Sequence, residues 1–161
     1  MRATGTTALV LLILARVIAA QQSMADLTKW FESDATAIMQ DPAVQRIGAY
    51  SAGVNNVRLT ECALTWSAED ASSVRVPLKS LDPQSIRLQT SKLLETRTII
   101  SLEMNMREQG EPATAVRGLA FMEMRRLSVL VRNQADGQRL LEATKRAIAL
   151  CQQATDSERR P

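Results

Sequence analysis

Two Met-X-Met segments, 104–106 and 122–124, are the most unusual chemical pattern in the chain. Residues two apart in a β-strand face the same side, so each segment presents two thioether sulfurs together. Thioethers are soft ligands that suit Cu(I), and this makes the segments a candidate for a copper site. The candidate ligands are Met104, Met106, Met122 and Met124.

The first methionine pair also continues an apolar strand face that includes Ile100 and Leu102. Methionine fills irregular gaps in protein cores, so core packing is the stronger interpretation. If the two segments pair as neighbouring strands, Met104 falls opposite Ala120 rather than opposite a methionine. We therefore expect these residues to belong to the core, and we expect no cofactor.

Catalytic chemistry is constrained because the chain contains no histidine. Histidine-based nucleophile pairs, histidine metal sites and the usual proton shuttle at neutral pH are thereby excluded. The S-x-x-K, G-x-S-x-G and glycine-rich phosphate-binding motifs are also absent from the sequence. A pair of carboxylates can still act as acid and base, with Glu61 and Glu103 as the nearest candidates. Solvated carboxylates on strands are far commoner, so we do not expect an enzyme.

Cys62 and Cys151 are the only two cysteines. Their wide spacing excludes C-x-x-C redox chemistry and a four-thiolate zinc site. In an exported domain, two cysteines most simply form one disulfide. Two buried free thiols are the alternative for a cytosolic protein.

Residues 1–20 have the pattern of a secretory signal peptide. A positive Arg2 precedes an apolar run, and Ala19-Ala20 offers a cleavage site before residue 21. The apolar run is interrupted by Arg16 and is too short for a stable membrane span. We therefore expect no stable membrane span once the signal peptide is cleaved. We expect export to the periplasm or the extracellular space; a start at Met24 would instead give a cytoplasmic protein.

The net charge of the 161-residue chain is +3. Removal of residues 1–20 takes away two arginines and leaves 141 residues with a net charge of +1. A nucleic-acid-binding surface needs a concentrated basic stripe with interleaved aromatic residues, which this chain lacks. The charge therefore indicates no nucleic-acid partner.

Two segments show the spacing of apolar residues that marks an amphipathic helix. The first covers 23–40 and ends at Asp41-Pro42, because the residue before a proline disfavours the helical conformation. The second begins near Asp136, and the polar residues 154–161 are expected to form a frayed tail after it. The apolar stripe of the second helix comprises Leu140, Leu141, Thr144, Ala147, Ile148 and Cys151.

Between these helices the apolar residues recur with a period of two, which predicts short antiparallel strands. In the first strand Cys62 shares the inward face with Trp66, and a bulge near Thr60 accounts for a change of phase. Pro77 indicates a sheet edge or a strand end. Residues 107–117 are expected to form a polar loop.

The order of elements predicts a single α+β domain over residues 21–153. It comprises an N-terminal helix, a curved antiparallel sheet of five to seven short strands, and a C-terminal amphipathic helix packed on the sheet. Cys62 on the inward strand face and Cys151 on the apolar helix stripe would then meet. The layout is similar in topology to pleckstrin-homology-like domains, without a shared motif.

A ligand pocket between the sheet and the last helix is a further candidate, although a filled core is commoner. Its lining residues would be Leu64, Trp66, Leu102, Met104, Phe121 and Ile148. We expect a small exported, non-enzymatic binding or structural module with one disulfide. The alternatives are a carrier of a small apolar ligand and an enzyme with an unrecognised Asp/Glu site. An open sheet edge near Pro77, or exposed Trp30 and Phe31, would indicate a protein partner or a homodimer.

Overall fold

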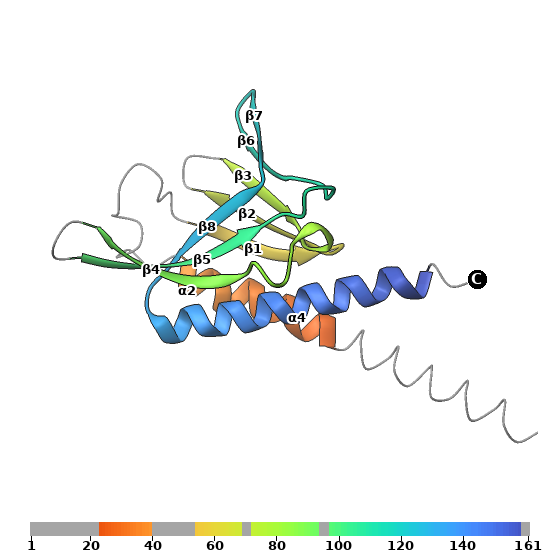
Figure 1. The fold of residues 1–161 in the computed structure, drawn as a ribbon, viewed down its shortest axis with the longest axis horizontal. Helices are drawn as coiled ribbons and strands as arrows, with labels where there is room; N and C mark the ends of the chain where they lie inside the picture. The colour runs from red at the N-terminus through yellow and green to blue at the C-terminus, as the bar shows by residue number, and fades with distance from the viewer. Residues whose placement is uncertain (1–22, 40–53, 69–71, 94–96, 159–161) are drawn as a thin grey trace, which may run out of the picture.

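Two helices lie along one side of a pair of antiparallel sheets (Figure 1). The computed structural model describes residues 23–39, 54–68, 72–93 and 97–158. This arrangement confirms the α+β layout with a helix at each end of the sequence order. The predicted signal peptide lies outside the described residues.

The first helix covers residues 23–39, as predicted. It is α-helical over 23–30, π-helical in η1 (Phe31–Ala35) and α-helical again in α2 (Thr36–Met39). The backbone N–H and the hydroxyl of Thr36 both donate to the carbonyl of Phe31, five residues earlier. The same hydroxyl accepts the backbone N–H of Val57 at 3.2 Å, so the widened turn ties the helix to the first strand.

Eight strands are present among the described residues, and they form two sheets. The five-stranded sheet has the order β1-β2-β3-β6-β7, and the three-stranded sheet has the order β4-β5-β8. All strand pairs are antiparallel. The strands are β1 (Val54–Thr60), β2 (Ala63–Ala68), β3 (Ser73–Pro77), β4 (Arg87–Leu93), β5 (Arg97–Asn105), β6 (Ala113–Arg117), β7 (Ala120–Met124) and β8 (Arg126–Val131).

The bulge predicted near Thr60 is wrong, because the chain reverses there. Thr60 pairs with Ala63 across a two-residue turn, and the register irregularity lies earlier in β1. Both turn residues, Glu61 and Cys62, have positive φ angles of 48° and 59°, the pattern of a type I′ hairpin turn. Such a turn interrupts the alternation of side chains, and the sequence pattern alone does not separate it from a bulge.

Two further strand boundaries concern Pro77 and the segment 107–117. Pro77 is the last residue of β3, which agrees with one of its two predicted positions. The prediction of a loop over 107–117 is wrong for residues 113–117, which form β6 between β3 and β7. The strand was missed because its inward-facing residues are small alanines rather than large apolar side chains.

The C-terminal helix, α4 (Gln134–Glu158), begins where the apolar stripe predicts. The side-chain oxygen of Asn133 accepts the backbone N–H of Asp136 at 2.9 Å and so caps the first turn. The carboxylate of Asp136 in turn accepts bonds from Asn133 and Arg132. The helix packs on β4, β5 and β8 and continues beyond Gln153 to Glu158.

A disulfide joins Cys62 to Cys151, as predicted, with a Cα–Cα distance of 5.6 Å. Cys62 lies in the β1–β2 turn rather than on a strand, so the expected placement on the inward strand face is wrong. Cys151 is fully buried on the inner face of α4. The bridge therefore fastens the end of the first hairpin to the last helix.

Candidate functional site

Hairpin β6–β7 carries the largest exposed apolar side chains in the described part of the chain. It projects from the body of the molecule on the side away from α4 (Figure 1). Val116, Leu119, Phe121 and Met122, hereafter the apolar tip, are exposed by 39%, 107%, 63% and 61%. Scattered single apolar residues are normal on a protein surface, whereas a cluster at the end of a projecting element is a candidate for an interaction site.

The turn chemistry explains why the chain reverses at this point. Arg117 pairs with Ala120 across the two-residue turn Gly118-Leu119. Gly118 has a φ of +57°, and Leu119 is not among the residues with positive φ. A positive φ only at the first turn position is the type II′ pattern, for which glycine is strongly preferred. The turn leaves Leu119 at the outermost point of the hairpin.

The register places apolar side chains on both faces of the hairpin. Val116 pairs with Phe121 on one face, and Met122 pairs with Ala115 on the other. The next pair towards the body on the first face is Thr114 with Glu123, which is polar. The apolar tip thus ends at the level of Glu123, which carries the first carboxylate towards the body of the molecule.

The two edges of the five-stranded sheet differ in whether another element covers them. At the β1 edge, the Thr36 hydroxyl accepts the N–H of Val57 and the Thr28 hydroxyl lies 3.4 Å from the carbonyl of Leu59. Helical residues therefore cover that edge. At the opposite edge, β7 has no strand neighbour on its outer side within the part of the chain that the structure describes. An uncovered edge strand can pair with another chain.

The base of the hairpin is fixed by arginines. Arg125 donates to the carbonyls of Arg107 and Gly110 at 2.9 and 2.7 Å. Arg126 donates to the side chain of Asn105 at 3.2 Å. These bonds anchor the end of the hairpin to the loop after β5 and to the last residue of β5, so the hairpin is held at its base.

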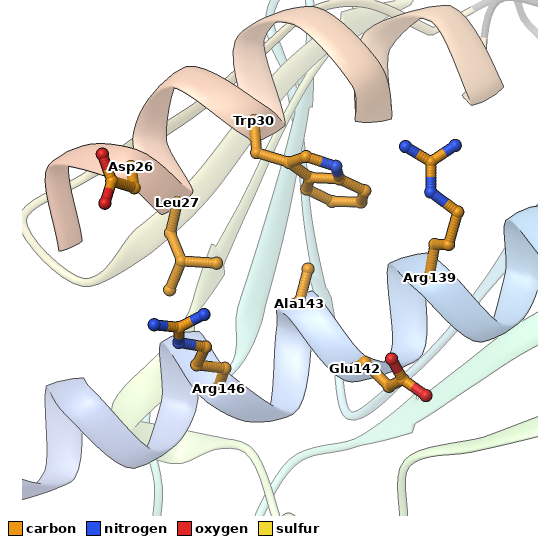
Figure 2. Close-up of a pocket in the computed structure, with 7 residues that line it drawn as sticks. All are labelled: Asp26, Leu27, Trp30, Arg139, Glu142, Ala143 and Arg146. Atoms are coloured by element: carbon orange, nitrogen blue, oxygen red, sulfur yellow. The ribbon is translucent and has the colours of Figure 1, made fainter. Parts of the chain in front are cut away.

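A groove of about 460 Å³ lies between the first helix and α4 (Figure 2). Its volume is within the range of small-molecule sites. Figure 2 shows Trp30 lying over Ala143, with Arg139 and Arg146 of α4 on either side. The lining residues are Asp26, Leu27, Trp30, Arg139, Glu142, Ala143 and Arg146.

Both arginines of this groove are bound to the facing helix. Arg139 forms an ion pair with Asp34 at 2.8 Å, and its guanidinium carbon lies 6.0 Å from the centre of the Trp30 ring. Arg146 donates to the hydroxyl of Ser23 at 2.7 Å. The groove is therefore a seam where charged side chains brace one helix against the other. Trp30 is half-buried and Phe31 fully buried, so neither provides the exposed aromatic surface that would indicate a protein partner.

Only some of the residues predicted to line a ligand pocket lie together in the structure. Leu64, Trp66, Leu102 and Met104 line an interior cavity between the sheets and the helices. Its volume is about 20 Å³, which is room for about one water molecule. Ile148 is buried in the core, but Phe121 lies on the exposed hairpin, away from the cavity lining.

The four methionines form two separate pairs, one at the end of β5 and the other on β7. Met104 is buried on β5 opposite Leu127, and Met106 is buried in an isolated bridge with Leu81. Met122 is exposed on β7, and Met124 is half-buried on the same strand. Met104 does not pair with Ala120, because β5 pairs with β8 instead of β7. The expectation of core packing therefore holds for Met104 and Met106 and is wrong for Met122, because no described element covers that part of β7.

The candidate carboxylates lie in different elements. Glu61 is exposed in the β1–β2 turn, and Glu103 on β5 receives bonds from Arg87 at 3.2 and 3.3 Å. Within the described residues, no group of three or more Cys, Asp or Glu side chains is arranged to hold a metal ion. Glu103 is thus a partner of a cross-strand arginine.

The sequence pattern predicts that Phe121 lines a pocket, and it does not indicate that the hairpin forms an exposed surface. The signal that could have revealed it is Gly118, set between two short runs with alternating side chains. Exposure itself depends on what packs against β6 and β7, and a single sequence does not carry that information.

No protein-family model matches the chain, and no curated protein or solved structure is significantly similar to it. Among the helices that the structure describes, none has both the length and the apolar character needed to cross a bilayer. A disulfide is compatible with an exported protein.

Proposed function

We propose that this protein is an exported, non-catalytic binding module that contacts its partner through the apolar tip of hairpin β6–β7. The observation that carries the proposal is the exposure of Leu119, Phe121 and Met122 together at the end of a projecting hairpin. Exposed apolar side chains order water around them, and covering them in a complex is favourable.

Different features of the chain support export and a non-catalytic role. The signal-peptide pattern of residues 1–20 and the Cys62–Cys151 disulfide both support an oxidising compartment outside the cytoplasm. The lack of histidine and of known catalytic motifs in the sequence supports a binding role rather than a reaction. The small volume of the interior cavity, about 20 Å³, favours surface contact over the carriage of an apolar ligand.

Site-specific photo-crosslinking in cells of the native source tests this function. p-Benzoylphenylalanine replaces Phe121 in one variant and Thr90 in the control, because Thr90 is exposed on β4 of the other sheet. This group inserts into C–H bonds of either protein or lipid, so the class of partner need not be known in advance. We expect adducts of higher mass at position 121 and few at position 90. Equal labelling at the two positions would overturn the proposal.

A further inference from the structure

We propose that the partner is a lipid surface: the apolar tip inserts into the interface of a bilayer that contains anionic lipid. This inference rests on the proposed function and assigns the class of partner to the same hairpin. Four properties of the hairpin support a lipid surface: the distribution of its apolar side chains, their depth, its backbone bonding and its charge.

Apolar side chains surround the end of the hairpin instead of covering one face. Phe121 and Val116 occupy one face, Met122 the other, and Leu119 the turn between them. A flat protein surface or an added strand would cover one side of this ribbon and leave the other in water. A fluid interface surrounds a convex projection and covers all of these side chains at once.

The apolar layers match the depth of an interfacial insertion. Glu123 is four residues after Leu119, which at about 3.3 Å per residue is roughly 13 Å along the strand. Interfacial protein segments bury their apolar faces about 5–10 Å into the boundary between headgroups and acyl chains. The hairpin can therefore reach this depth before the pair Thr114–Glu123 meets the headgroups.

Backbone bonding limits the insertion to the interface. β7 pairs with β6 on its inner side and has no strand neighbour on its outer side within the described residues. Unpaired backbone groups are costly in hydrocarbon but are satisfied by water and headgroups at the interface. The hairpin thus suits peripheral attachment, which agrees with the finding that no described helix could cross a bilayer.

The charge at the base of the hairpin favours an anionic surface. The hairpin itself, residues 113–124, contains one arginine and one glutamate, and Arg125 and Arg126 directly follow it, so residues 113–126 together carry a net charge of +2. Arg117 is exposed beside the turn, opposite Ala120. Its positive charge lies at the level of the apolar tip, where it attracts lipid phosphates. The arginines at the base of the hairpin add attraction from a greater distance.

Vesicle co-sedimentation of the purified protein tests this proposal. Vesicles of phosphatidylcholine mixed with phosphatidylglycerol are compared with vesicles of phosphatidylcholine alone. A tip variant carries Leu119→Ser, Phe121→Ser and Met122→Ser, and a matched control carries Leu119→Met, Phe121→Leu and Met122→Leu, which keeps the tip apolar. We expect the tip variant to lose at least about tenfold in affinity for the mixed vesicles and the control to bind like the unchanged protein.

Two further measurements separate insertion from adsorption. Arg117→Gln is expected to weaken binding to the mixed vesicles by about fivefold without affecting the neutral ones. Phe121→Trp places a fluorophore in the tip, and quenching by brominated lipid is expected only if the tip enters the bilayer. Circular dichroism of each variant checks that it is folded.

The outcomes distinguish this inference from the proposed function. Equal vesicle binding by the tip variant and the unchanged protein would overturn the lipid proposal. Absence of vesicle binding, with protein adducts from position 121 in cells, would also overturn it but leave the binding function intact. Concentration-dependent dimerisation of the unchanged protein that the tip variant abolishes, without vesicle binding, would assign the hairpin to a second copy of the chain instead.

Discussion

The two phenylalanines of the chain occupy opposite environments. Phe31 is fully buried between the first helix and the sheets, where its ring meets Trp30 edge to face at 5.2 Å. Phe121 is 63% exposed on β7. The same side chain therefore contributes to stability at one position and to the surface of a proposed binding site at the other.

Alanine substitution should separate these two roles. Phe31→Ala removes a filled core volume and is expected to lower the free energy of unfolding by about 3–5 kcal/mol. Phe121→Ala removes a solvated ring and should change it by no more than about 0.5 kcal/mol. Urea denaturation of both variants, followed by circular dichroism, measures the difference. A large loss of stability in Phe121→Ala would mean that the ring packs within the folded chain and is not part of a free surface.

At the residue scale, the sequence predicted side-chain faces better than side-chain burial. The alternation in β5 correctly placed Met104 in the core with Leu102. The same reasoning placed Phe121 in a pocket, although no described element covers that part of β7. A period of two indicates which residues share a face of a strand. A face is buried only if another element packs on it.

The two hairpins of the five-stranded sheet differ in their turn chemistry. Gly118 supplies the positive φ of the β6–β7 turn without steric cost. In the β1–β2 turn the positive φ angles fall on Glu61 and Cys62, which carry side chains. Left-handed backbone costs such residues roughly 1–2 kcal/mol each. The disulfide at Cys62 and the strand pairing around the turn hold this conformation.

Replacing Glu61 with a residue that tolerates the left-handed region should stabilise the protein. Glu61→Asn is expected to raise the free energy of unfolding by up to about 1 kcal/mol, because asparagine adopts positive φ more readily. Glu61→Gln is the matched control, since it removes the same charge without that preference. The midpoints of urea denaturation report the difference. If the two variants are equally stable, the turn does not store the strain inferred from its φ angles.

At the element scale, the sequence pattern predicts the helices well but does not predict which strands pair. The stripes of the helices at 23–39 and 134–158 repeat over several turns, so each helix is specified by many residues. β7 and β8 follow one another closely, yet β7 pairs with β6 and β8 pairs with β5. Local alternation cannot assign such partners, because pairing between distant strands depends on the whole fold.

At the scale of the molecule, the disulfide links the first hairpin to the last helix. The joined residues are separated by 89 positions, a loop that includes β2 to β8 and most of α4. Apart from this bond, α4 is held to the sheets by an apolar face that includes Leu140, Ala147 and Ile148. The disulfide and this apolar face therefore both hold α4 against the sheets.

Removal of the bridge should weaken the whole fold without changing the hairpin that projects on the far side. In the chain-entropy model, closure of a loop of this length stabilises the native state by roughly 4–5 kcal/mol, and measured losses range about 2–5 kcal/mol. We expect the variant Cys62→Ala/Cys151→Ala to lose about 2–5 kcal/mol of the free energy of unfolding, measured by urea denaturation. Each single variant should lose nearly as much. A reducing agent should destabilise the unchanged protein and leave the double variant unaffected. Equal stability of the unchanged protein and the double variant would show that the apolar face of α4 alone secures the helix.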